Sequence, residues 1–209
     1  MPQLEEHQLR VAGVTSLILD NITPRPPLTL RGGVEDKQDI ITACLLHDMG
    51  NIIKFDFSQT HKIVNYNLNF SYWKAVQTEF QEKYGVNEHN AHVQIAREIG
   101  VNDRVIELIE AISFLGAPQN ASGKDFGKKI CQYADDRVSP FGVVSLEERL
   151  LDLRQRYAHY IGDEAVKINF ETALRQIERQ IFTYCKIRPN DITEELVKQK
   201  LNVLKKWEI

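Results

Sequence analysis

A histidine and an aspartate stand side by side at His47-Asp48, directly after the largely apolar segment from Ile40 to Leu46. Burying a carboxylate without a partner costs several kcal/mol, so a positive group is expected beside Asp48. A divalent cation shared by both side chains would meet this need, because imidazole and carboxylate suit Mn, Fe, Zn or Ni. A buried hydrogen bond between the two side chains, or an ion pair with a distant arginine, would explain the pair equally well.

His7 is a second candidate ligand, far from this pair along the chain. It lies on a stripe formed with Leu4, Val11, Val14 and Ile18, whose spacing of three and four residues is helical. The imidazole is therefore predicted to face the core. A single histidine in this position is more often a packed residue than a ligand.

Asp135 is a third candidate, in a segment of helical spacing. It shares a helical face with Cys131 and Val138, so its carboxylate is predicted to point inward and to need a partner. Asp136 falls on the face of Lys129 and is predicted to point to solvent.

His89 and His92 are three residues apart at the start of a predicted helix, on one face with Ala96. Such a pair can chelate a metal, with His89 as the better candidate because it lies nearer the helix start. Alternatively, one histidine lies at the surface and the other packs inside. His61 and His159 have polar neighbours and are expected to be ordinary surface residues.

The elements that carry these residues are predicted to be helices. Ser145 and Glu148 form a capping box that opens one of them. Apolar spacing and breaking residues place helices at 3–22, 35–54, 69–84, 88–99, 102–115, 125–138, 145–160, 163–185 and 191–207. The fold class is therefore all-α, a compact single-domain helical bundle, with loops at 23–34, 55–68 and 116–124 that shape a pocket. Residues 1–160 are expected to form the domain and residues 161–209 a C-terminal helical extension packed on it, which could also form a homodimer surface.

Composition narrows the class of protein. The chain has 209 residues and a net charge of −3, which favours neither nucleic acid nor an anionic membrane as a partner. Cys44, Cys131 and Cys185 form no CxxC motif, which favours a reducing cytoplasmic location. The start of the sequence lacks the pattern of a signal peptide, and no apolar run reaches the length of a membrane helix.

The order His7, His47-Asp48, Asp135 resembles the H…HD…D pattern of the HD-domain superfamily of metal-dependent phosphohydrolases. The segment 45–51 is similar to the central motif of that family, and the segments 133–138 and 144–149 resemble its closing part. The resemblance spans residues 4 to 160. It implies an all-α fold with one or two metal ions, held by His7, His47, Asp48 and Asp135.

The resemblance also indicates where this chain departs from some relatives. His89 matches the first of the extra histidines that certain members carry, but no histidine occurs near Phe114, where a second is expected. This argues against a full two-metal site. Asn51 stands where some relatives have lysine, and Ile52 and Ile53 stand near the position of the glutamate of nucleotidase members.

The leading functional hypothesis is hydrolysis of a phosphoester, of a nucleotide or a related small molecule, by water activated on a divalent ion (Mn, Fe, Co, Ni, Zn or Mg). Asp48 would both bind the ion and orient the water. Lys54, Asn51 and Arg137 are the candidate substrate-binding residues, although Lys54 is more typical of a lysine that extends to solvent from a helix end. The alternatives are a di-iron HD-type oxygenase, with extra ligands from His61, His89 and His92, and a catalytically silent HD protein that binds or senses a ligand.

Overall fold

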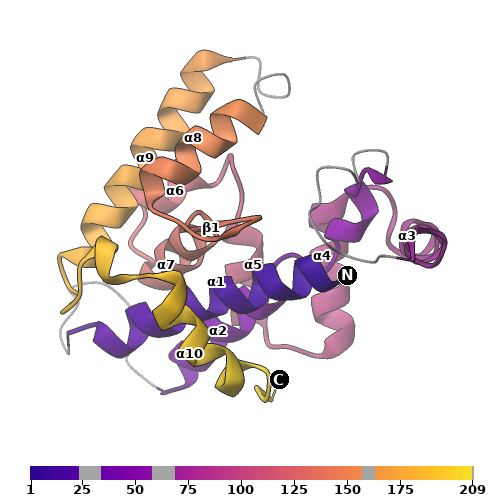
Figure 1. Ribbon diagram of the computed structural model, residues 1–209, viewed down its shortest axis with the longest axis horizontal. Coiled ribbons are helices and arrows are strands. Elements are labelled where there is room, and N and C mark those ends of the chain that lie inside the picture. Colours follow the sequence, from indigo (N-terminus) through magenta and orange to yellow (C-terminus); the bar gives the residue numbers. More distant parts are fainter. Residues whose placement is uncertain (24–33, 58–68, 157–162, 209) are drawn as a thin grey trace.

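The computed structural model describes residues 1–23, 34–57, 69–156 and 163–208, and these form an all-α fold, as predicted (Figure 1). The longer helices are α1 (Pro2–Asn21), α2 (Val34–Leu46), α3 (Phe70–Tyr84), α4 (Glu88–Ile99), α5 (Asp103–Ala111), α7 (Phe126–Asp135), α8 (Leu146–Arg156), α9 (Glu164–Phe182) and α10 (Glu194–Leu204). The short elements are η1 (Asn51–Lys54), α6 (Ala117–Ser122), η3 (Pro189–Asp191) and the antiparallel strands β1 (Val138–Ser139) and β2 (Gly142–Val143).

The core forms where α1, α2, α5 and α7 pack against one another. Val11, Ile18, Ile40 and Ile130 from these helices are completely buried, which explains the apolar stripes in the sequence. Because α1 and α7 lie against each other, and α2 contacts both, the ends of three helices can meet at one place. This arrangement brings His7, which is remote in sequence, toward residues 47 and 135.

The C-terminal helices share this core. α9 packs on α6 and α7, and α10 packs on α1. Leu174 and Ile177 of α9 and Val197 of α10 are fully buried within the same apolar cluster as α1. α8 and α9 run antiparallel side by side, joined by the ion pairs Arg175–Glu147 and Arg154–Glu171 (Figure 1). The boundary at residue 160 and the homodimer surface stay predictions.

Several predicted helices are shorter than expected, such as the one at 102–115, which ends at Ala111, and two segments differ more. The helix predicted for 35–54 ends at Leu46, followed by a turn and then by η1. The segment expected to be a loop at 116–124 contains α6, which begins after Gly116 with Pro118 in its first turn and ends at Ser122, before Gly123. Proline fits the first turn of a helix, so these residues delimit a short helix rather than a loop. The predicted loops 23–34 and 55–68 lie mostly outside the described residues.

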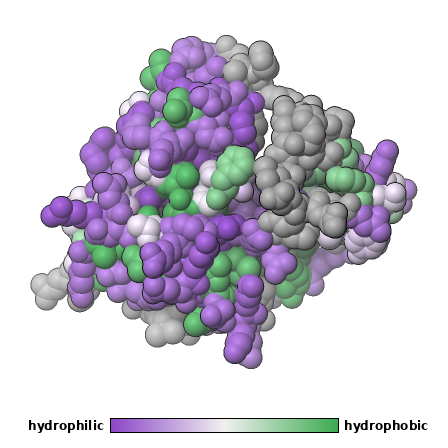
Figure 2. All heavy atoms as spheres, in the orientation of Figure 1, coloured by the Kyte–Doolittle hydropathy of each residue, from purple (hydrophilic) through white to green (hydrophobic). Residues whose placement is uncertain are grey.

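Hydrophilic side chains cover most of the face shown in Figure 2, with apolar side chains in small separate patches. In the described part of the chain, no helix combines the length and the hydrophobicity that crossing a bilayer requires.

Candidate metal centre

His47 and Asp48 lie in the turn that follows α2. The helical hydrogen-bond pattern stops at Leu46, and the amide of Asn51 donates to the carbonyl of Asp48 at 3.0 Å. Consecutive residues of a continuous helix point about 100° apart. Because the helix ends here, both side chains can face the same point. This is the reason why two adjacent residues can serve one centre.

His7 of α1 and Asp135, the last residue of α7, complete the cluster. Nε2 of His7 lies 3.0 Å from Oδ1 of Asp135 and 3.5 Å from Oδ2 of Asp48. Nε2 of His47 lies 3.3 Å from Oδ1 of Asp135 and 3.7 Å from Oδ1 of Asp48. Three separate segments therefore deliver two imidazoles and two carboxylates to one place, as the sequence predicts.

The geometry of this cluster fits a divalent cation. Ligand atoms around one ion, at bonds of about 2.0–2.2 Å, are separated by roughly 3 to 4 Å, and the distances above fall in that range. Among the described residues, the ligand atoms of His7, His47 and Asp48 all lie within 4.8 Å of one another.

The hydrogen bonding of His47 supports the same interpretation. Nδ1–H of His47 donates to the carbonyl of Cys44 at 2.8 Å, which fixes the ring and leaves Nε2 facing the cluster. Nε2 is buried and has no good hydrogen-bond partner among the described residues. A carbonyl acceptor behind a histidine whose other nitrogen points at the centre is the usual support of a metal-binding imidazole.

The pKa values of His47 and Asp135 show that a bound cation would replace the proton of His47. Burial of the imidazole lowers the pKa of His47, but the charges of Asp48 and Asp135 outweigh it and raise that pKa to about 10. Burial acts in the opposite direction on Asp135, yet contacts with His47 and His7 hold the pKa of its carboxyl well below the usual range. Because a ligand imidazole must be neutral, a cation that binds here has to displace the proton of His47.

The turn after Asp48 is fixed by α4. The amide of Gly50 donates to Nδ1 of His92 at 2.9 Å, so the proton of this neutral imidazole is on Nε2. His92 is buried, and burial lowers its pKa to about 4. His92 therefore acts as a support for the turn, and its Nδ1 is not available to a metal.

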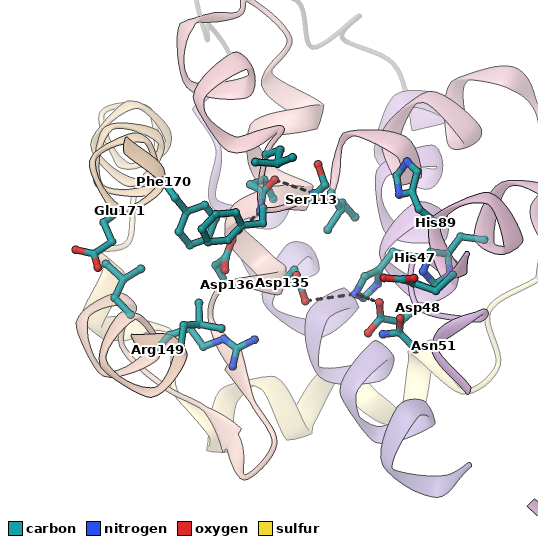
Figure 3. Close-up of a pocket in the computed structure, with 18 of the residues that line it drawn as sticks. His47, Asp48, Asn51, His89, Ser113, Asp135, Asp136, Arg149, Phe170 and Glu171 are labelled. Atoms are coloured by element: carbon teal, nitrogen blue, oxygen red, sulfur yellow. Dashed lines mark hydrogen bonds and ion pairs between the residues drawn. The ribbon is translucent and has the colours of Figure 1, made fainter. Parts of the chain in front are cut away.

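A cavity of about 570 Å³ opens beside the cluster (Figure 3). His47, Asp48 and Asp135 line one end of it. The other end is built largely by α8 and α9 and by the segment after α5. The rings of Phe114 and Phe170 stack there with centroids 4.2 Å apart.

Comparison with known proteins identifies the domain. A family model described as HD domain matches residues 4–137, which is more than half of the chain. The chain belongs to the HD-domain family. Neither a curated protein nor a solved structure matches it. The family consists mostly of metal-dependent hydrolases and includes some non-catalytic members.

The other predicted site residues lie outside the His/Asp cluster. Lys54 and Asn51 line the cavity, where Nζ of Lys54 pairs with Glu88 at 3.2 Å. His89 also lies on the wall, outside the group of converging ligand atoms. Its role as a ligand stays a prediction. Arg137 is buried, and the prediction that it binds substrate does not fit this position, because its guanidinium bonds to protein groups. His61 and His159 lie outside the described residues.

The predicted orientation of Asp136 is wrong. Asp136 is only 4% exposed, lines the cavity and accepts a hydrogen bond from Nε2 of Gln132 at 2.8 Å. Burial, together with the nearby charge of Asp135, raises the pKa of Asp136 to about 7. The face of α7 that was expected to be wet also carries Lys129, whose ammonium group bonds to the carbonyl of Ala121 at 2.8 Å. This face is covered by α6 and α9.

One residue of the site was not found from the sequence. Arg149 of α8 is buried and lines the cavity. It lies four residues after Ser145, in a predicted helix start and in the segment 144–149 that resembles the closing part of the family, but neither signal assigned a role to its side chain.

Proposed function

We propose that this HD domain is a metal-dependent hydrolase of a phosphoester, acting on a small phosphorylated molecule such as a nucleotide. The convergence of His7, His47, Asp48 and Asp135 at the end of a cavity of about 570 Å³ supports this proposal most directly. The cavity is large enough for a small molecule, because ligand pockets commonly measure about 300–1,000 Å³.

The four residues of the cluster would hold the ion. A divalent ion bound there supplies a Lewis acid for the phosphoryl oxygen and a means to ionise water at neutral pH. The Cys44 carbonyl keeps the His47 ring in place, and His92 keeps the following turn in place. Asp48 is partly exposed to the cavity, so a carboxylate oxygen not used on the ion can accept a hydrogen bond from the attacking water and orient it.

Asn51 is a candidate for contact with the substrate. It lines the cavity three residues after Asp48, and its Oδ1 is buried with no hydrogen-bond partner in the described residues. Lys54 lies nearer the solvent and adds a positive charge at the edge of the cavity, although Glu88 shares that charge. Both residues belong to η1 and are held by the same turn as Asp48.

The alternative of a di-iron oxygenase needs additional ligands. Nδ1 of His92 is occupied by the Gly50 amide, and His89 lies outside the cluster of ligand atoms. Metal analysis separates the two proposals, because a di-iron centre requires two irons per chain and the phosphohydrolase proposed here requires one ion at the cluster.

The test is activity of the metal-loaded protein. The protein is loaded with Mn²⁺, Co²⁺ or Mg²⁺ and assayed with p-nitrophenyl phosphate, a phosphodiester and a panel of nucleotides. We expect turnover that Asp48→Asn abolishes and that Asp20→Asn, a change of an exposed aspartate on α1, leaves intact. A folded, metal-loaded protein that is inert toward every substrate would overturn the proposal and favour a silent binding protein.

A further inference from the structure

Arg149 is a buried cation in the cavity wall. It is the fourth residue of α8, is 9% exposed and lies beyond the part of the chain that the family match covers. In Figure 3 its guanidinium extends from α8 toward the side of the cavity on which His47 and Asp48 lie. Arginine is seldom buried without a full set of partners.

The contacts of Arg149 are incomplete. Nη1 donates to Oδ2 of Asp152 at 2.8 Å, while Nε is buried with no partner in the described residues. Asp152 is also shared, because Arg156 donates to the same carboxylate at 2.9 and 2.6 Å. Asp152 thus contacts two guanidinium groups, and Arg149 reaches it through Nη1 alone.

Another buried arginine of the same domain shows what complete bonding looks like. Arg137 donates to the carbonyls of Val144, Pro189 and Ile192 and to the hydroxyl of Tyr133. Protein groups thus accept hydrogen bonds from all three nitrogens of its guanidinium group, as expected of a residue with a structural role. Arg149 has one such bond, so it retains donors for a molecule in the cavity.

The other cations of the described cavity wall each have a carboxylate partner. Lys54 pairs with Glu88 at 3.2 Å and Arg154 pairs with Glu171, while Nζ of Lys167 lies 3.7 Å from Glu164. Asp136, the other carboxylate near Arg149, accepts a hydrogen bond from Gln132 at 2.8 Å; the positive charge of Arg149 acts to lower the pKa of Asp136, but the described contacts include no hydrogen bond between the two side chains. Arg149 also lies near the N-terminal end of α8, where the helix dipole disfavours a positive charge. A bound anion would offset both costs.

We infer that Arg149 binds an oxyanion of the phosphate group of the substrate through its guanidinium fork, opposite the metal cluster. This inference rests on the proposed function and adds to it a residue that recognises the substrate. A planar guanidinium matches two oxygens of a phosphate, which a lysine cannot do. Leu150 and Leu153, next to Arg149 on the cavity wall, leave an apolar surface for the group that the phosphate esterifies.

The experiment measures binding of inorganic phosphate to the Mn²⁺-loaded protein by calorimetry. In Arg149→Met we expect the dissociation constant to rise about 10-fold to 100-fold, as for loss of a charge-assisted hydrogen bond. Arg149→Lys should give an intermediate rise, since it keeps the charge and loses the fork. Arg179→Met, an exposed change on α9, is the matched control and should leave phosphate binding unchanged.

Metal content and thermal stability are measured on the same samples. If Arg149→Met does not fold, the Arg149→Lys variant decides the question. A phosphate affinity within twofold of the parent in the folded, metal-loaded variants would overturn the inference, as would failure of the parent to bind millimolar phosphate.

Kinetics give a second measurement, because a purely structural role of Arg149 would not change KM and kcat to different extents. With a substrate that is turned over, Arg149→Lys should raise KM more than it lowers kcat. The phosphate measurement does not depend on turnover. A protein that binds phosphate through Arg149 but hydrolyses nothing would contradict the proposed function and leave this inference intact.

Discussion

Replacement of Gly50 by alanine tests how the HD domain holds its candidate metal ligands. A Cβ at Gly50 would lie 2.9 Å from Cβ of Ala91, 3.0 Å from the carbonyl oxygen of Glu88 and 3.1 Å from Nδ1 of His92. The φ angle of Gly50 is −85°, which any residue adopts, so the effect comes from packing and not from backbone strain. Because Glu88 and Ala91 belong to α4, the turn that carries Asp48 has to move away from α4.

The cost follows from two contributions. Overpacking of a tight contact costs about 1 to 3 kcal/mol. Lengthening the hydrogen bond from the Gly50 amide to His92 costs about 1 kcal/mol more. We therefore expect Gly50→Ala to lower the free energy of unfolding by about 2 to 4 kcal/mol. Loss of such support for a ligand typically weakens metal binding about 10-fold to 100-fold, and we expect that range for Mn²⁺.

Urea unfolding in the presence of EDTA gives the stability, and a titration with Mn²⁺ gives the metal affinity. Gly85→Ala is the matched control, because its Cβ would meet nothing within 4 Å while its φ of +82° imposes strain. It should cost about 1 to 3 kcal/mol of stability without any change in metal affinity. If Gly50→Ala binds Mn²⁺ as tightly as the parent, the turn does not position Asp48 and the reasoning is refuted.

Three further predictions concern protons and buried charge. In EDTA, the free energy of unfolding should fall as the pH drops from 6.5 to 4, because the folded pKa of His92, about 4, lies below the ordinary value of 6.5 and the unfolded chain binds more protons. His92→Gln should reduce this fall, and equal pH profiles would contradict the prediction. Binding of Mn²⁺ near neutral pH should release a proton from His47, whose pKa is raised to about 10. Calorimetry in buffers of different ionisation enthalpy measures that release, and identical heats would argue against it. Arg137→Met should lose about 3 to 5 kcal/mol in urea unfolding, since it leaves three carbonyls without their donor. A loss below about 1 kcal/mol would exclude this structural role.

The sequence was sufficient to predict that the histidines and aspartates of the cluster point inward, because local periodicity determines which way each side chain points. The stripe of Val11, Val14 and Ile18 carries His7 to the core side of α1, and all three apolar residues are completely buried. Asp135 follows the same logic on α7, since Cys131 is buried on its face. In each case the direction of a side chain depends on its own helix.

The predictions from sequence fail for Asp136 and Arg149, where a segment distant in the chain buries the side chain. Asp136 and Lys129 share a polar face of α7, and a helix considered alone would expose them to water. α6 and α9 cover that face, so Lys129 is 1% exposed and Asp136 becomes part of the cavity. The spacing of residues within α7 does not indicate that other helices pack on this face. Arg149 was missed for the same reason, because its burial depends on how the antiparallel pair of α8 and α9 closes the cavity.

The cavity is lined by two parts of the chain, one that carries the candidate metal ligands and one that forms the opposite wall. The candidate ligands occur between residues 7 and 135, whereas Arg149, Leu153 and Phe170 of the opposite wall come from later helices. Substitutions in α8 and α9 can therefore change which molecule the cavity accepts during divergent evolution while the candidate metal ligands are preserved. A chimera that exchanges only these two helices between homologues would be a direct way to transfer specificity.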